Sequence, residues 1–230
     1  MLIMSDINKN TVSAKNQLAV NSIISYENAE NDGIRILFVG NSITRHGPKA
    51  DIGWHGDWGM AASSKDKDYV HLVIKRVLEK RPDAGFCICQ AAGWERGYFD
   101  GEKALEAFSD AHDFGADIII FRIIENCQTD IFDSELFLKE YKRFASWLGE
   151  KKNAKVIVTT GFWCHEKGDE MIKKAAEEEG YVLVTLGDLG AKDENKALGL
   201  FEHEGVALHP GDKGMQAIAD RIYDKLDKLI

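Results

Sequence analysis

Two segments of the chain carry side chains that could act together chemically. In the first, the apolar residues 36–39 lead into Gly40-Asn41-Ser42, so a turn there would present the serine hydroxyl. A hydroxyl becomes an effective nucleophile only when a base beside it takes its proton. In the second segment, His209 lies between an apolar stretch and a proline. An imidazole can accept that proton and later return it to a leaving group, so Ser42 and His209 predict nucleophilic catalysis.

Three further groups could stabilise the negative charge that develops on a carbonyl oxygen during attack. Such a site needs preorganised N–H donors. The candidates are the backbone N–H groups of Ser42 and Gly93 and the side-chain amide of Asn126, in loops that follow predicted strands. Gly93 could equally be a turn residue and Asn126 a loop cap. The Gly-x-Ser-x-Gly elbow of the α/β-hydrolases is absent, because Thr44 stands where it needs the second glycine.

The elements that must position these groups are strands and helices in alternation from Ile34 onward. This alternation predicts a parallel sheet with helical crossovers, whose strand-to-helix loops all open at one edge, where α/β proteins bind ligands. Residues 1–32 are polar and weakly patterned, and we treat them as an N-terminal arm or short appended element before a single domain, 33–230. Five covered strands predict a three-layer α/β/α sandwich. The strands are expected at 34–40, 84–90, 116–124, 154–160 and 180–186.

The composition excludes several classes of partner. The net charge is −9 and there is no long Lys/Arg run, which argues against nucleic acid or an anionic membrane as partner. We expect a small-molecule or carbohydrate substrate instead, and leave the oligomeric state open. The N-terminal residues lack an export signal, and no window reaches the ~18 apolar residues of a membrane span, so we expect a cytoplasmic protein.

The four cysteines give no sign of a metal site or a disulfide scaffold. None forms a C-x-x-C pair, so we expect thiols and no bound metal or other cofactor. Cys87 and Cys89 are two apart in an apolar run and should share one buried face of a strand. A zinc site built from Cys127, Cys164 and His165 is an alternative that their residue types permit and their spacing does not indicate.

Gly40-Asn41-Ser42 resembles the first sequence block of the SGNH (GDSL-type) hydrolases, with Asn41 where the family commonly has Asp. Gly93, Asn126 and His209 resemble the glycine, asparagine and histidine of the later blocks, in the same order along the chain. The resemblance covers about residues 34 to 230. It implies a flavodoxin-like sandwich, a serine nucleophile, an oxyanion hole made by Ser42, Gly93 and Asn126, and no cofactor.

The chain departs from this family at the support of the histidine. The family usually has an aspartate three residues before the histidine, and that position is Val206. An imidazole still needs a partner that fixes its tautomer. Glu202, Glu204, another side chain or a backbone carbonyl could supply it, which would give a Ser/His dyad or an atypical triad.

The long loop 44–65 and the strand ends hold residues that could contact a substrate. Trp54, Trp94 and Trp163 could stack on a sugar or wall an acyl pocket, or could simply pack their loops. Arg122 could bind a polar substrate group, although a structural ion pair with Glu125 is the favoured interpretation because buried charges are seldom unpaired.

Taken together, the sequence predicts a serine esterase that removes a short acyl group, such as acetyl, from a polar substrate such as a carbohydrate. Two alternatives stay open. One is a catalytically inactive binding domain on the same scaffold, suggested by Asn41 and Val206. The other is a hydrolase of the lysophospholipase or thioesterase type.

Overall fold

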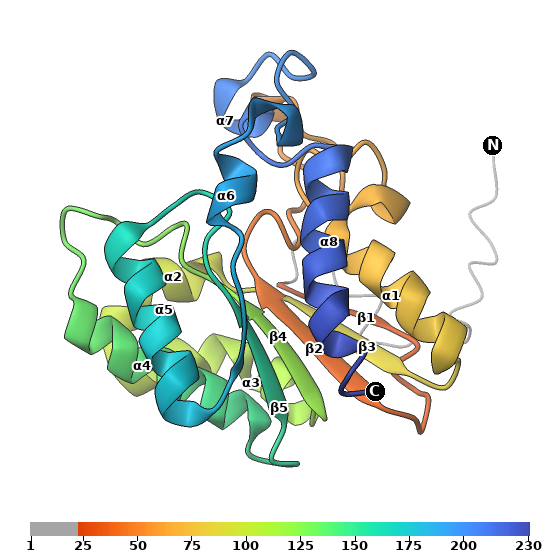
Figure 1. Ribbon diagram of the computed structural model, residues 1–230, viewed down its shortest axis with the longest axis vertical. Coiled ribbons are helices and arrows are strands. Elements are labelled where there is room, and N and C mark those ends of the chain that lie inside the picture. Colours follow the sequence, from red (N-terminus) through yellow and green to blue (C-terminus); the bar gives the residue numbers. More distant parts are fainter. Residues whose placement is uncertain (1–22) are drawn as a thin grey trace, which may run out of the picture.

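The computed structural model describes residues 23–230, which form one six-stranded sheet in the order β1-β3-β2-β4-β5-β6. The five predicted strands are all present and pair in parallel with one another (Figure 1). Their bounds are β2 Arg35–Gly40, β3 Gly85–Gln90, β4 Ile118–Arg122, β5 Lys155–Thr159 and β6 Val182–Val184.

The prediction of a five-stranded sheet was one strand short. The sixth strand, β1 (Ile24–Glu27), pairs antiparallel with the outer side of β3. Four residues within a polar segment are too few to show the alternation of apolar and polar residues that indicates a strand. The segment is extended because its backbone pairs with that of β3. The rest of the predicted arm, residues 1–22, lies outside the described residues.

Helices cover both faces of the sheet, as the three-layer prediction requires. Side chains alternate along β2: Ile36 and Phe38 belong to the core under α1 and α8, whereas Leu37 and Val39 belong to the core under α2 to α5. The helices are α1 Tyr69–Lys80, α2 Ala92–Gly97, α3 Ser109–Asp113, α4 Ser134–Gly149, α5 Glu166–Glu179, α6 Gly187–Gly190, α7 Glu204–Ala207 and α8 Asp212–Leu226. Short 3-10 segments cover Ala50–Ile52, Lys65–Lys67, Tyr98–Phe108 and Asp193–Asn195.

The order of the parallel strands identifies where a site should form. From β2 the chain crosses to β3 on one side and then returns to β4 on the other side of β2. The carboxyl ends of β2 and β4 are therefore the point at which the connections diverge, which is where open α/β sheets bind ligands. Ser42 follows β2 and Asn126 follows β4.

Asp68, the residue that caps the N-terminus of α1, joins three parts of the fold. Its carboxylate accepts hydrogen bonds from the backbone N–H of His71 at 2.8 Å and from that of Gly59 at 2.9 Å. The His71 ring contacts Asp68 at 2.7 Å and Glu27 of β1 at 3.1 Å. Burial alone would lower the pKa of His71, but the hydrogen bonds to these two carboxylates raise it to about 9. A charged His71 therefore ties β1 and the loop after β2 to α1.

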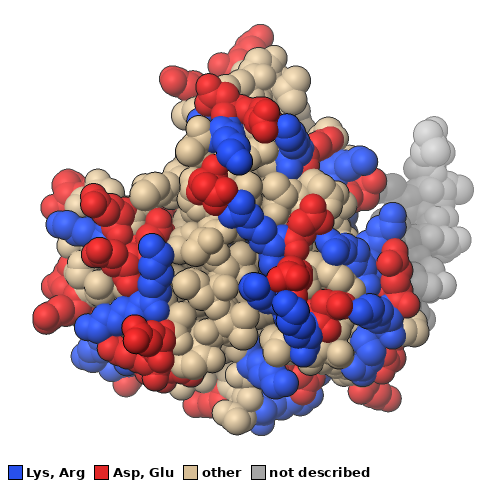
Figure 2. Space-filling model, viewed as in Figure 1, with Lys and Arg blue, Asp and Glu red and all other residues tan. Residues whose placement is uncertain are grey.

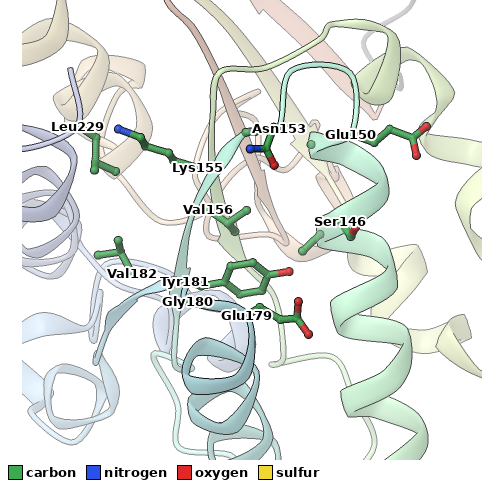
Figure 3. A pocket seen from close by; sticks show the side chains of 13 residues that line it. Ser146, Glu150, Asn153, Lys155, Val156, Glu179, Gly180, Tyr181, Val182 and Leu229 are labelled. Carbon is green, nitrogen blue, oxygen red and sulfur yellow. The ribbon is translucent and has the colours of Figure 1, made fainter.

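The surface shows no concentration of one charge on the face drawn in Figure 2, where both signs are mixed around an uncharged central area. A hollow of about 550 Å³ lies between α4, the start of β5 and the residues before β6 (Figure 3). Lys155 and Val182, at the amino ends of β5 and β6, line it, so it lies at the opposite edge of the sheet from Ser42. Within residues 23–230, no helix has the length and apolar character needed to cross a membrane.

Candidate active site

The Ser42 hydroxyl oxygen lies 2.8 Å from Nε2 of His209, at the edge of the sheet where β2 ends. A tight turn lifts the serine out of the strand, because the backbone N–H groups of Thr44 and Arg45 both donate to the carbonyl of Asn41, at 2.9 and 3.0 Å. Glycine is required before this turn, since a Cβ at Gly40 would lie 1.8 Å from Thr44 Oγ1. The two residues predicted to act together are therefore in hydrogen-bond contact.

The segment that carries His209 is fixed on both sides. Its carbonyl accepts from Ala197 N–H at 2.9 Å and its own N–H donates to the Val206 carbonyl at 3.0 Å. Three residues later, the Asp212 carboxylate accepts from Ser63 N–H at 2.8 Å and from Ser63 Oγ at 2.7 Å. Asp212 thus connects the start of α8 to the long loop after β2, and the imidazole reaches Ser42 from a restrained backbone.

The backbone carbonyl of Gly205 orients the imidazole. It lies 2.6 Å from Nδ1 of His209, so Nδ1 carries the proton and the lone pair of Nε2 faces Ser42. Of the alternatives left open for this role, the structure has the backbone carbonyl. The candidates Glu202 and Glu204 are both exposed, and the Gly205 carbonyl takes the Nδ1 position instead. Val206, where the family has aspartate, is 1% exposed and packs into an apolar cluster.

The environment of His209 keeps the ring neutral at pH 7. Burial lowers its pKa to about 4, because the charged imidazolium loses hydration; the hydrogen bond to Gly205 opposes this and the positive charge of Arg122 adds to it. The neutral ring has a free Nε2 lone pair. This is the protonation state that a general base needs before attack.

Two predicted oxyanion donors follow the strands on either side of β2: Gly93 follows β3 and Asn126 follows β4. Gly93 is the second residue of α2, where a helix has no internal acceptor for the N–H, and the space beside its Cα is open. The start of α2 is joined to β2 by a hydrogen bond of 2.5 Å from Ala91 N–H to the Gly40 carbonyl. Asn126 is half-buried, and its amide oxygen accepts from Arg96 at 2.8 Å. The oxyanion role of Ser42, Gly93 and Asn126 stays a prediction.

No family model and no curated protein sequence matches the chain significantly. Several solved structures do resemble it. A family two carbohydrate esterase from Cellvibrio japonicus aligns over 85% of this chain and 61% of its own, with 17% identity and a TM-score of 0.56. A two-domain esterase active on acetylated mannans aligns over 87% of this chain and 50% of its own, with 19% identity and a TM-score of 0.56. A member of the lipolytic protein G-D-S-L family from Veillonella parvula aligns over 83% and 97%, with 16% identity and a TM-score of 0.50.

The chain has the SGNH-hydrolase fold. It spans only 61% and 50% of the two esterases named first, so the likeness concerns one domain of those proteins. Because the sequence identity is below 20%, the structural similarity to these proteins defines the fold and not the chemistry.

Of the three tryptophans predicted to contact substrate, one lies against the Ser42–His209 pair. The Trp163 ring is half-buried and packs edge-to-face on the His209 ring, with centroids 4.9 Å apart. Trp54 and Trp94 are only 3% and 1% exposed, so substrate contact by these two is corrected to packing. Trp54 donates its indole N–H to the His46 carbonyl within the loop, and Trp94 stacks in the core beneath α4.

Arg122 does not face a substrate either. It is completely buried and forms an ion pair with Glu125, as the favoured structural interpretation predicted. The other terminal nitrogen of Arg122, Nη1, donates to Asn41 Oδ1 at 3.0 Å. Asn41 Nδ2 in turn donates to Glu125 at 2.6 Å. The Asn that replaces the family's usual Asp is thus a donor as well as an acceptor, which an ionised carboxylate could not be.

Each of the cysteines and the histidine considered for zinc has a different environment. Cys127 is buried with its thiol on the Glu95 carbonyl, Cys164 is exposed, and His165 caps α5 by accepting from Gly168 N–H at 3.0 Å. Across residues 23–230 no cluster of three His, Cys, Asp or Glu side chains could hold a metal ion. Cys87 and Cys89 are buried in the sheet, as their spacing predicted.

Sequence reasoning allowed a backbone carbonyl beside His209 without identifying Gly205, and it missed the buried carboxylate of Glu95. A backbone carbonyl leaves no trace in residue types. Glu95 did leave a signal, since it stands among Ala, Gly and Trp in a short helix that follows a buried strand. A charge in such a position is rarely left unpaired.

Proposed function

We propose that this protein is a serine esterase that hydrolyses a short-chain acyl ester, such as acetyl, of a polar substrate such as a carbohydrate. The observation that carries the proposal is the 2.8 Å contact between Ser42 Oγ and His209 Nε2, with Nδ1 of the same ring held by the Gly205 carbonyl. A neutral imidazole in this orientation can take the hydroxyl proton as the serine attacks.

In the first half-reaction, Ser42 Oγ attacks the ester carbonyl carbon and its proton moves to His209 Nε2. The carbonyl oxygen becomes an oxyanion, for which the N–H groups of Ser42 and Gly93 and the Asn126 amide are the proposed donors. The tetrahedral intermediate collapses when the bond to the alcohol oxygen breaks. His209 then returns its proton to that oxygen, and the acyl group is left on Ser42.

In the second half-reaction, water replaces the alcohol. His209 Nε2 takes a proton from water as its oxygen attacks the acyl-enzyme carbonyl, and the same donors hold the oxyanion. Collapse breaks the bond to Ser42 Oγ, which takes the proton back from His209. The Gly205 carbonyl acts in both steps by stabilising the imidazolium through Nδ1–H. A neutral carbonyl does this more weakly than a carboxylate.

Two observations support a polar ester as substrate. The proteins named in the comparison include a carbohydrate esterase and an esterase active on acetylated mannans. In this chain the Trp163 ring stands against His209 with part of its surface exposed, where it could cover a sugar ring or an acyl group. The chemistry requires no cofactor.

The proposal is tested with p-nitrophenyl acetate and a fluorophosphonate probe, which reacts with activated serines. Wild type should hydrolyse the ester and take up one equivalent of probe, and Ser42→Ala and His209→Ala should do neither. Ser146→Ala, an exposed serine on α4, is the matched control and should behave as wild type. If the wild-type protein neither labels nor hydrolyses esters from acetate to octanoate, it is no serine esterase and the binding-domain alternative stands.

The same ester series separates the proposal from the lysophospholipase or thioesterase alternative. A short-chain esterase should lose kcat/KM steadily from acetate to octanoate. An increase with chain length, or a preference for acyl thioesters, would favour the alternative. A gain in rate on acetylated xylan or mannan over p-nitrophenyl acetate would support a carbohydrate ester.

A further inference from the structure

Behind the proposed oxyanion donor lies a buried carboxylate that the mechanism above does not use. Glu95, on α2, is 1% exposed, and three N–H groups donate to it. Asn126 Nδ2 donates to Oε2 at 2.6 Å, whereas Ile124 N–H and Asn41 Nδ2 donate to Oε1 at 2.6 and 3.0 Å. Three donors around one carboxylate are the partners expected for its ionised form.

An ionised carboxylate only accepts hydrogen bonds, so it determines how its neighbours are turned. Because Oε2 accepts from Asn126, the amide of that residue must present its nitrogen to Glu95 and its oxygen to Arg96, which donates to it at 2.8 Å. The second N–H of the Asn126 nitrogen stays available. Asn126 is half-buried, whereas Glu95 lies beneath it, so the remaining N–H has an open side to reach.

We propose that Glu95 is a positioning residue: its carboxylate holds the Asn126 amide nitrogen turned toward the reacting ester, so that the second N–H can stabilise the oxyanion. This inference rests on the proposed esterase function. Glu95 itself touches no reacting atom and acts through Asn126. The same carboxylate holds Asn41, directly before the nucleophile, and so ties α2 to the turn at the end of β2.

Loss of the Glu95 charge should turn the amide. In Glu95→Gln, the side-chain oxygen fits best at Oε1, where it faces the Ile124 and Asn41 donors, and this places an NH2 group at Oε2. Two NH2 groups then face each other. Asn126 relieves the conflict by rotating its amide, which moves the nitrogen away from its catalytic direction. The rotation also ends the hydrogen bond from Arg96, whose exposed side chain can turn to water.

Protonation of Glu95 should have the same effect, because one oxygen then becomes a donor. Burial, and next the negative charge of Glu125, raise the pKa of Glu95 above its ordinary value, against the lowering by its N–H donors. Other charged groups nearby are Arg122, which donates to Asn41, and Arg96, which donates to Asn126. The Cys127 thiol donates to the Glu95 backbone carbonyl, and burial raises its pKa, so it stays neutral.

The experiment is a double-mutant cycle on p-nitrophenyl acetate with wild type, Glu95→Gln, Asn126→Ala and the double variant. Removal of one oxyanion donor costs about 10²–10³ in kcat, and we expect about a 10²-fold loss for Glu95→Gln with KM changed less than about 3-fold. In the Asn126→Ala background, Glu95→Gln should change kcat by less than about 2-fold. Equal losses in both backgrounds would overturn the inference, because Glu95 would then act independently of Asn126.

The matched control is Glu140→Gln. Glu140 is another buried glutamate, 3% exposed on α4 and paired with Arg143 at 3.3 Å, away from the proposed site. It should keep the wild-type kcat. If both glutamate variants lose kcat alike, loss of a buried charge in general explains the effect and the inference is wrong.

A second measurement needs no change at Glu95. His209, with a pKa of about 4, is neutral at any pH well above that value. A fall in kcat that begins well above pH 4 as the pH is lowered therefore requires another group. Wild type should show such a fall as Glu95 gains its proton, and Asn126→Ala should lack it. Persistence of the fall in Asn126→Ala, or its absence from wild type, counts against the inference. If instead wild type and Ser42→Ala are equally inactive, the esterase proposal itself fails and takes this inference with it.

Discussion

Replacement of Val206 by aspartate introduces the residue that SGNH hydrolases usually have three positions before the histidine, and we expect it to destabilise this protein. The Val206 side chain is 1% exposed and belongs to an apolar cluster with Trp54, Met60, Ala61 and Ala197. The imidazole it would need to reach already has the Gly205 carbonyl 2.6 Å from Nδ1. A carboxylate at position 206 therefore enters an apolar cluster and finds Nδ1 occupied.

The expected cost follows from two terms. Loss of the buried valine side chain costs roughly 1.5–3 kcal/mol of apolar burial. Burial of a carboxyl group without a hydrogen-bond partner adds about 1–3 kcal/mol, even after it takes up a proton to avoid the charge. The free energy of unfolding should fall by about 2.5–6 kcal/mol, a large share of the roughly 5–15 kcal/mol typical of a domain.

Urea unfolding followed by tryptophan fluorescence measures the stability, and p-nitrophenyl acetate hydrolysis measures kcat. Val206→Ala is the matched control, since it removes bulk without adding charge and should cost about 1.6 kcal/mol for two methyl groups. At a temperature where Val206→Asp is still folded, kcat should not rise. A variant with near wild-type stability and a higher kcat would mean that the aspartate reaches His209, and our account of the Gly205 carbonyl would be refuted.

Three further outcomes follow from contacts described above. The folded-state pKa of His71 is raised from 6.5 to about 9, so its contribution to stability should be complete below pH 6.5 and lost as the pH rises through 9. Urea unfolding should therefore give a lower free energy of unfolding at pH 9.5 than at pH 6, and His71→Gln should reduce that difference. Asp212→Ala removes two hydrogen bonds from Ser63 and should lower kcat more than it raises KM, at a stability cost of about 1–2 kcal/mol; an unchanged kcat would show that this contact does not position His209. Trp163→Ala removes a ring 4.9 Å from that of His209 and should raise KM for acetylated sugars more than for p-nitrophenyl acetate, and an equal effect on both would exclude sugar contact.

Patterns that repeat along the chain were predictable, and single tertiary contacts were not. The five parallel strands are indicated by apolar runs bounded by helical spacing, and the crossover rule then brings Ser42, Gly93, Asn126 and His209 to one edge of the sheet. The strand β1 (Ile24–Glu27) is too short to carry such a signal and exists because β3 offers it an edge.

Exposure and orientation were the parts that the sequence could not supply. Trp54 and Trp163 both stand in loops at the active edge, yet one is covered by a neighbouring loop and the other stands against His209. The support of His209 is a peptide carbonyl, and every residue has one. The residue types limited the group that orients the His209 ring to a few alternatives. The fold of the segment around α7 decides among them.

The separation of the dyad along the chain has a consequence for biosynthesis. Ser42 and His209 are 167 residues apart, and the helices beside them, α1 and α8, pack on each other. Because chains emerge from the ribosome N-terminus first, the serine leaves the exit tunnel long before its base does. A partly made chain carries only an ordinary, unreactive hydroxyl. Under the proposed mechanism, the serine therefore gains its reactivity only after His209 and α8 have been made and have folded against β2 and α1.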